Sequence, residues 1–227
     1  MIISASYRTD IPAFYGRWFM NRLRAGYCKV VNPYSGKPSR ISLKWADVDG
    51  FVFWTKNLAP FVKHLAEIHR AGFPFIIHYS INGYPRKLER AVINVNRSVE
   101  LFKQTATEYG PRVCVWRYDP IVFSSLTDFD FHVRQFDRLA GELADYTDEV
   151  IISFVNPYPK VIKKMNRAAR KFSFTWTDPQ DDEKRALAKK LVAVASGYGL
   201  KLSVCSQKKY VVPSSKAACC VDARRLE

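Results

Sequence analysis

The amino-acid sequence predicts an α/β domain in which parallel strands alternate with helices. Six short apolar segments recur along the 227 residues, and an amphipathic stretch of helical length separates each from the next. Most of these segments are apolar at consecutive positions rather than at every second one, which is typical of strands covered on both faces. Six βα units in series indicate a barrel-like or doubly wound α/β fold.

The predicted elements follow one another in a regular order. Strands are predicted over residues 2–6, 51–55, 73–80, 113–117, 150–155 and 202–205. Helices are predicted over residues 11–24, 58–71, 86–109, 127–145, 160–170 and 178–196. Residues 32–44 are rich in proline, glycine and serine and form the long predicted loop. Because no linker divides the chain, we expect a single domain over residues 1–227.

Residues at the helix boundaries support these bounds. The first helix has Thr9 or Asp10 as its candidate N-cap and Pro12 in its first turn, where a missing N–H costs little. Asn57 is a candidate cap of the second helix. Thr127 begins a segment that resembles a capping box, with Asp130 in place of the usual Glu. Glycines follow several helices and favour their ends: Gly26, Gly72, Gly110 and Gly197.

The composition is strongly basic. Lys and Arg number 36 against 21 Asp and Glu, which gives a formal net charge of +15 and an isoelectric point near 9.7. Such a balance favours a polyanionic partner such as nucleic acid, phosphate groups or an acidic membrane surface. A solvated basic surface would give the same numbers, and the cations are spread over several short clusters rather than one long tract.

Nothing in the sequence indicates a secreted or membrane-spanning protein. The N-terminal residues lack a basic region followed by a long apolar run, and no stretch approaches the roughly 20 apolar residues of a membrane span. We therefore expect a cytoplasmic protein without a membrane partner, in which thiols stay reduced. Its five cysteines then indicate free, metal-binding or catalytic thiols rather than a disulfide framework.

Polar side chains follow the predicted strands where each strand ends. In parallel α/β folds, functional groups gather at these carboxyl ends. Three of the side chains at these ends are cations, and they are expected to converge on one opening at the carboxyl edge of the strands, the mouth of the predicted barrel. Cations so close together repel each other unless carboxylates or an anionic ligand neutralise them, so a bound phosphate or carboxylate would suit the site. The residues that follow the first, second and fourth strands are Arg8 and Asp10, Lys56 and Asn57, and Arg117 and Asp119.

The same residues also have purely structural interpretations. Asp10 is equally well explained as a helix cap. Arg8 is placed to pair with Asp119 as a bridge across the top of a barrel. Arg117 and Asp119 alternate along their strand, so both face the same way and can pair with each other. Lys56 is also consistent with a solvated loop residue. The sequence leaves both interpretations open for each residue.

No arrangement of histidines in the sequence indicates a catalytic or metal site, whereas two cysteines indicate part of a metal site. His132 is expected at the surface of its helix, and no HExxH motif or Walker-type loop occurs. Cys205 lies at a strand end, and Cys220 follows in the tail; both are candidate metal ligands. The set is incomplete, because four ligands, or three for an open iron–sulfur cluster, are expected.

Several long and unusual blocks occur along the sequence. They are residues 4–15 (SASYRTDIPAFY), 49–57 (DGFVFWTKN), 82–86 (NGYPR), 115–121 (VWRYDPI) and 150–154 (VIISF), followed by Cys220-Val-Asp222. These blocks resemble the uncharacterised family DUF1848, whose Cys-Ile-Asp block is similar to Cys220-Val-Asp222. The resemblance runs from residue 2 to about residue 222.

Members of that family resemble radical S-adenosylmethionine (radical-SAM) enzymes. The resemblance implies a partial TIM-like (β/α)6 barrel of the radical-SAM type, with mostly parallel strands. It also implies a C-terminal CxxxCxxC motif, whose three thiolates hold a [4Fe–4S] cluster and leave one iron open for the amino and carboxylate groups of S-adenosylmethionine. This sequence contains no CxxxCxxC, so we expect the cluster segment to be missing from it.

Three functional hypotheses follow. The first is the barrel portion of a radical-SAM-like iron–sulfur enzyme of unknown substrate, inactive as written and unable to bind the cluster or S-adenosylmethionine stably. The second is a nucleic-acid-binding protein. The third is a non-catalytic module that binds an anion such as a phosphorylated metabolite. In the first, the residues expected to line the barrel mouth and hold an anionic cofactor or substrate are Arg8, Asp10, Lys56, Asn57, Arg117 and Asp119.

Overall fold

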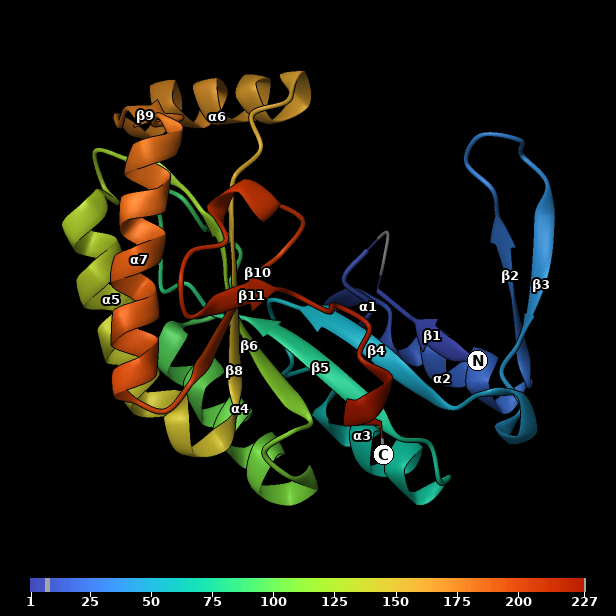
Figure 1. Ribbon diagram of the computed structural model, residues 1–227. Helices are drawn as coiled ribbons and strands as arrows, with labels where there is room; N and C mark the ends of the chain where they lie inside the picture. The colour runs from blue at the N-terminus through green and yellow to red at the C-terminus, as the bar shows by residue number, and fades with distance from the viewer. Residues whose placement is uncertain (7–8, 227) are drawn as a thin grey trace. The chain divides into compact units, whose positions relative to one another are not determined.

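The computed structural model describes residues 1–6 and 9–226, and the chain divides into two compact units. The first unit comprises residues 1–79 and the C-terminal segment from Val221, and the second comprises residues 80–220. Both units combine helices with parallel strands, so the predicted α/β class is confirmed (Figure 1). Within the described residues, no helix is long and apolar enough to cross a membrane.

The first unit is built on parallel strands flanked by short helices. Its central strand pairs with one neighbour on each side, with Phe51 opposite both Ile3 and Phe75. The ring of Phe19 packs edge-on against Phe51 and Phe53, which places the core between the strands and the second helix. The parallel strands are β1 (Ile2–Ser4), β4 (Gly50–Thr55) and β5 (Phe75–Ser80), and the helices are α1 (Ile11–Phe14), α2 (Gly16–Arg24) and α3 (Val62–Arg70).

Two predictions for the first unit are corrected. The predicted helix over residues 11–24 is interrupted at Tyr15, whose backbone is not helical (φ −128°, ψ 22°). The predicted loop over residues 32–44 is instead part of an antiparallel hairpin formed by β2 (Tyr27–Val31) and β3 (Pro38–Ser42). The turn residues Pro, Ser and Gly mark the tip of that hairpin, where Gly36 adopts a positive φ of 66°.

The second unit contains an open ladder of four parallel strands in the order β6-β8-β10-β11. Helices α5 and α7 lie side by side against it (Figure 1). The strands are β6 (Cys114–Ile121), β8 (Glu149–Phe154), β10 (Lys201–Val204) and β11 (Ser215–Ala217), with β7 (Phe123–Ser124) and β9 (Trp176–Thr177) as an antiparallel pair. The helices are α4 (Val95–Tyr109), α5 (Phe129–Leu143), α6 (Pro159–Phe172) and α7 (Asp181–Gly197).

The core of the second unit forms where β6 meets α5. Trp116 stacks on Phe136, and Tyr118 meets the same ring edge-on. His132 is fully buried beside them, so its expected surface position is wrong. Its Nε2–H donates to the Val122 carbonyl (3.1 Å), and its Nδ1 accepts from the Tyr118 hydroxyl (3.0 Å). Both ring nitrogens are satisfied in the neutral form, which explains how this histidine tolerates burial.

The long helix predicted over residues 86–109 starts only at Val95. Asn94 caps it, because its side chain accepts a hydrogen bond from the Asn96 N–H at 2.9 Å. The residues before it form an irregular segment in which the Arg86 guanidinium donates to two backbone carbonyls of that same segment. The Leu88 and Glu89 N–H groups also donate to the Pro85 carbonyl, so the segment combines a short backbone turn with the Arg86 bonds. This correction matters for function, because the segment lines a pocket.

Candidate functional site

A buried ion pair lies on β6 of the second unit. The strand continues to Ile121, beyond its predicted end, so Arg117 and Asp119 alternate within it and face the same way. Arg117 Nε lies 3.0 Å from Asp119 Oδ2, and Arg117 Nη2 lies 2.5 Å from the same oxygen. Their side chains are only 7% and 10% exposed. The structure therefore contains the Arg117–Asp119 ion pair, which is one of the two interpretations that the sequence allows for these residues.

Two serines complete the surroundings of this carboxylate. The Ser80 hydroxyl donates to Asp119 Oδ1 (3.2 Å), and the Ser153 hydroxyl donates to Oδ2 (3.3 Å). Burial alone would lower the pKa of the Arg117 guanidinium, but the charge and hydrogen bonds of Asp119 raise it overall. The cation is thus neutralised within the protein. A further role for Arg117 in holding an anionic ligand stays a prediction.

Two cysteines lie beside the ion pair. Cys205 follows β10 and Cys220 follows β11, and these strands are parallel neighbours with Val204 opposite Ala217. The two sulfurs are 3.3 Å apart, and Arg117 Nη1 lies 3.7 Å from the Cys220 sulfur. A disulfide bond measures about 2.05 Å, so the two groups are thiols in contact rather than a bonded pair.

The contact shifts the two thiol pKa values in opposite directions. A hydrogen bond from Cys220 lowers the pKa of Cys205 to about 5, against the opposing effect of burial and with support from Arg117. The same hydrogen bond raises the pKa of Cys220, because its proton is held between the sulfurs. The contact between the sulfurs and the nearby Arg117 guanidinium therefore favour the ionised form of Cys205.

The cysteines of this chain do not fit the cluster implied by the family resemblance. A [4Fe–4S] cluster with an open iron needs three thiolates, and the geometry brings together two. Over residues 1–6 and 9–226, no group of three or more His, Cys, Asp or Glu side chains could hold a metal ion. Of the predicted metal ligands, Cys205 and Cys220 are brought together, but no third ligand joins them among the described residues.

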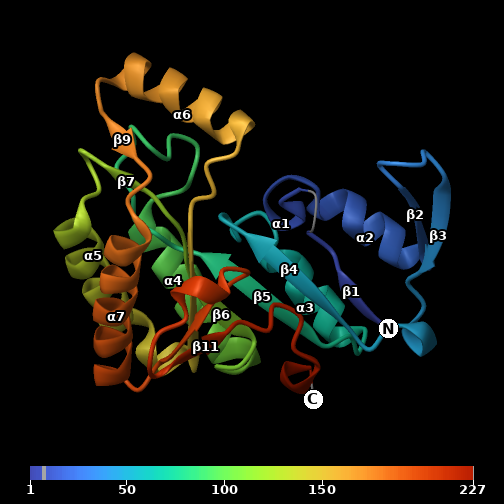
Figure 2. The same ribbon diagram turned by 45° about the horizontal axis from the view of Figure 1, so that its top comes forward.

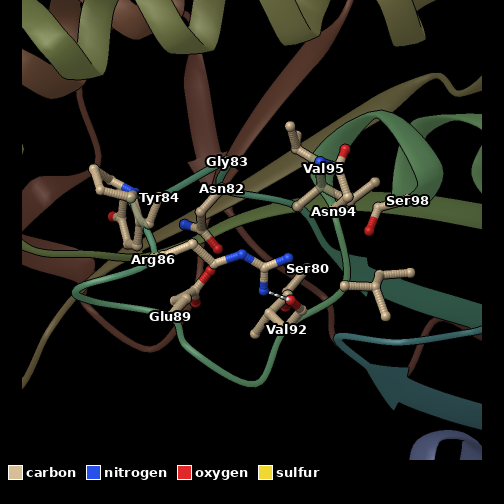
Figure 3. A pocket seen from close by; sticks show the side chains of 13 residues that line it. Ser80, Asn82, Gly83, Tyr84, Arg86, Glu89, Val92, Asn94, Val95 and Ser98 are labelled. Atoms are coloured by element: carbon tan, nitrogen blue, oxygen red, sulfur yellow. Dashed lines mark hydrogen bonds between the residues drawn. The ribbon is translucent and has the colours of Figure 1, made fainter.

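A pocket of mixed polar and apolar lining opens beside Ser80, which also contacts Asp119 of the ion pair (Figure 3). Its volume is about 260 Å³, and Ser80 belongs both to its wall and to the hydrogen bonds of Asp119. The Asn82 amide, oriented so that both its groups are satisfied, donates to the Asp119 carbonyl (3.0 Å) and accepts from the Asp119 N–H (3.2 Å). The remaining lining includes Gly83, Tyr84, Pro85, Arg86, Glu89, Val92, Ile93, Asn94, Val95 and Ser98.

Gly83 fixes the shape of the pocket wall. Its φ is +65°, a conformation that favours glycine, and a Cβ at this position would overlap Gln135 Nε2. The Tyr84 hydroxyl, next along the chain, donates to the Pro120 carbonyl (2.9 Å) and accepts from the Val122 N–H (3.1 Å). Close packing and these bonds hold the segment against β6.

Arg86 is the pocket residue that sequence reasoning missed. Its Nη1 donates to the carbonyls of Val92 (2.5 Å) and Arg90 (3.3 Å), which orients the guanidinium beside the first turn of α4 (Figure 3). Ser98, one turn into that helix, is 2% exposed and lines the same pocket. The block at residues 82–86 did carry a signal, but the helix predicted from Arg86 onward placed it on a helix instead of in a pocket.

The predicted site residues of the first unit are arranged around Asp10. Its Oδ1 accepts from the Ala13 N–H (2.9 Å), which confirms Asp10 as the cap of α1, and its Oδ2 accepts from the Lys56 N–H (2.8 Å). Asn57 caps no helix, because α3 starts at Val62; its side chain accepts from the Ala59 N–H (3.1 Å) instead.

The gathering of all six predicted residues at one mouth stays a prediction. Asp10, Lys56 and Asn57 belong to the first unit, whereas Arg117 and Asp119 belong to the second. Arg8 lies outside the described residues. The structure therefore brings the Arg117 and Asp119 side chains together in the second unit, and in the first unit it brings the Asp10 carboxylate to the Lys56 backbone N–H.

Comparison with known proteins gives one match. Neither a protein of curated function nor a solved structure is detectably similar to this chain. A family model does match, and it covers residues 2–227, which is nearly the whole chain. That family is described as a domain of unknown function, DUF1848. The chain is therefore a member of the DUF1848 family.

Proposed function

We propose that the second unit binds a small anionic molecule in the pocket beside residues 82–86. The observation that carries this proposal is the position of Arg86, whose guanidinium is held by two carbonyls at the edge of a cavity of about 260 Å³. Carbonyl bonds to Nη1 orient the group and leave its other donors for a ligand. A carboxylate matches the planar fork of a guanidinium.

The first turn of α4 adds to this preference for an anion. It contains no acidic residue, and the N-terminal end of a helix carries a partial positive charge and N–H groups without helical partners. Asn94 satisfies one of these, the Asn96 N–H. The Ser98 side chain is almost fully buried at the pocket wall, where its hydroxyl group can donate a hydrogen bond to a ligand oxygen.

Glu89 limits the charge of the ligand. This carboxylate lies in the same lining as Arg86, so a polyphosphate would meet like charge there. The pocket volume is likewise small for a nucleotide. A monoanionic carboxylate with a short body suits both constraints.

A thermal-shift titration tests this proposal. Butyrate should raise the melting temperature, whereas its neutral analogue butyramide should not, because only the anion gains from the guanidinium and the helix end. Arg86→Gln and Ser98→Ala should each weaken the butyrate shift, and Arg86→Lys should retain part of it. Lys87→Gln is the matched control, because Lys87 is an exposed neighbour outside the pocket lining. Equal shifts with butyramide, or equal losses with Lys87→Gln, would contradict the proposal.

The family resemblance extends the proposal to a partial TIM-like (β/α)6 barrel with radical-SAM-like chemistry. In the second unit each successive parallel strand lies beside the last, from β6 to β8, β10 and β11, which supports such an order of βα units. The iron–sulfur chemistry requires three thiolates, and Cys205 with Cys220 supplies two. We therefore assign no step through a cluster or S-adenosylmethionine.

A second candidate function, nucleic-acid binding, is favoured by helix α6. None of its residues is buried, and Figure 2 shows it away from the bodies of α5 and α7 of the same unit. Phosphate backbones attract such exposed arrays of cations. The cations of α6, which has no acidic residue, are Lys160, Lys163, Lys164, Arg167, Arg170 and Lys171.

Salt-dependent binding to a fluorescent oligonucleotide tests this second function. Changing Lys163 and Lys164 to Glu should weaken binding and flatten its salt dependence, since fewer counterions are released. The matched control changes Lys189 and Lys190, two exposed lysines on α7, to Glu. If both double variants lose affinity equally, net charge explains binding and α6 is not the interface. Absence of binding at about 50 mM salt removes this function.

A further inference from the structure

The thiols of Cys205 and Cys220 are positioned to react with each other. Their sulfurs are 3.3 Å apart at the ends of two paired strands, β10 and β11. Disulfide formation would need the sulfurs to approach by about 1.2 Å, which small rotations of two half-buried side chains can supply.

The surroundings favour a reactive thiolate at Cys205. Arg117 Nη1 lies 3.7 Å from the partner sulfur, and its charge favours an anion on the pair. The contact between the two sulfurs and the neighbouring guanidinium lower the pKa of Cys205, which favours its thiolate form. Cys114 behaves in the opposite way, because complete burial raises its pKa and leaves it an unreactive core residue.

We propose that Cys205 and Cys220 form a redox-active thiol pair that reduces a hydroperoxide, with Cys205 as the attacking sulfur and Cys220 as the resolving one. The site is separate from the pocket assigned above to an anionic ligand, and the proposal does not depend on that assignment.

The chemistry balances without any metal. The Cys205 thiolate attacks the terminal oxygen of the peroxide, the O–O bond breaks, and the leaving alkoxide or hydroxide takes up a proton. The sulfur is then a sulfenic acid. The Cys220 sulfur attacks it, an S–S bond forms, the S–O bond breaks, and water leaves with the Cys220 proton. Two thiols are oxidised by two electrons, and the peroxide is reduced to an alcohol or water.

In this proposal Cys205 reacts first, because a thiolate is the nucleophile and the contact between the sulfurs, with the Arg117 cation nearby, lowers the pKa of Cys205. Cys219 adjoins Cys220 in the chain and is exposed, so it is the natural competitor for the resolving step. The strand pairing places Cys220, rather than Cys219, against the Cys205 sulfur.

The experiment treats the reduced full chain with one equivalent of hydrogen peroxide in the presence of a metal chelator. Intact mass should fall by two hydrogen atoms, and peptide mapping without reductant should show a Cys205–Cys220 linkage. Cys220→Ser should stop the reaction at the sulfenic acid, which dimedone labels on Cys205. Cys205→Ser should slow peroxide consumption by about ten-fold or more, because the remaining thiols are mostly protonated.

Cys28→Ser is the matched control, since Cys28 is also half-buried but lies in the hairpin of the first unit. This variant should behave like the unaltered protein. A linkage through Cys219, no dimedone adduct on Cys205 in Cys220→Ser, or equal slowing by Cys28→Ser would each overturn the proposal. The Cys219→Ser variant should still form the Cys205–Cys220 disulfide, which would show that Cys219 is not required for the reaction.

Discussion

Arg117 and Asp119, two positions apart on β6, close a buried ion pair in which Nε and Nη2 of the guanidinium both donate to the carboxylate. The pair shows why alternation along a strand brings opposite charges together. It also shows why one of the predicted ligand-binding cations is already neutralised within the protein.

Removing the charge of Asp119 should destabilise the fold. Asp119→Asn leaves the Arg117 guanidinium buried without its counterion, and breaking a buried pair in this way costs about 3 to 5 kcal/mol. Urea denaturation measures the change. The control is Glu100→Gln, which breaks an exposed ion pair with Arg97 and should cost less than about 1 kcal/mol. If Asp119→Asn and Glu100→Gln lowered the unfolding free energy equally, burial of the Arg117–Asp119 pair would not account for its effect on stability.

Cys205 should remain reactive in mildly acidic solution. With a pKa of about 5, most of this thiol is ionised at pH 6, whereas an ordinary thiol with a pKa of about 8.5 loses reactivity ten-fold with each unit below that value. Iodoacetamide labelling followed by peptide mass spectrometry should give a midpoint near pH 5 for Cys205. Cys220→Ala removes the donated hydrogen bond and should shift that midpoint upward; an unchanged midpoint would contradict the assigned cause.

Stability should fall in acid because of His132. Burial lowers its pKa from 6.5 to about 4, so as pH falls the unfolded chain takes up a proton before the folded protein does. Stability is therefore complete above pH 6.5 and is lost as pH falls toward 4, by about 3 kcal/mol from this group. His132→Gln should flatten the pH dependence of the unfolding free energy in this window. The exposed His69, changed to Gln, should leave it unaltered.

Gly83→Ala should destabilise the pocket wall by more than backbone conformation explains. A Cβ there would overlap Gln135 Nε2, whereas Gly199 has a similar φ of +73° and open space around it. Gly199→Ala therefore measures the cost of the backbone alone, about 1 kcal/mol, and Gly83→Ala should exceed it by up to about 1 kcal/mol, because the end of the flexible Gln135 side chain must move aside. Adding Gln135→Ala to Gly83→Ala should restore part of the loss. If the stability losses of Gly83→Ala and Gln135→Ala simply added in the double variant, a steric clash between these two residues would be excluded.

Much of the fold follows from the sequence because apolar periodicity reflects burial directly. Each of the six predicted strands is present, and Asp10 caps its helix as its position after the first strand suggests. The main failures occur where side chains override local preference. Arg86 bonds to nearby carbonyls and keeps residues 86–94 out of α4, and no helical periodicity reveals such bonds.

The candidate site could be predicted only in part, for a related reason. Strand ends in a parallel sheet identify which residues lie near one edge, and this rule found Arg117, Asp119 and Cys205. It could not give the contact between Cys205 and Cys220, because the short strand β11 that positions Cys220 has no apolar signature. Distances between side chains depend on register, which the sequence does not reveal by periodicity alone.

Ser80 joins the two sites of the second unit. Its hydroxyl belongs to the pocket wall and donates to Asp119, which in turn holds Arg117 against the Cys220 sulfur. An anion that draws this hydroxyl toward itself removes one donor from the carboxylate and changes the field at the thiols. Ligand binding in the pocket would then change the reduction equilibrium of the two thiols by some factor. Thermodynamic reciprocity requires that oxidation of the thiols change the affinity of the pocket for its ligand by the same factor.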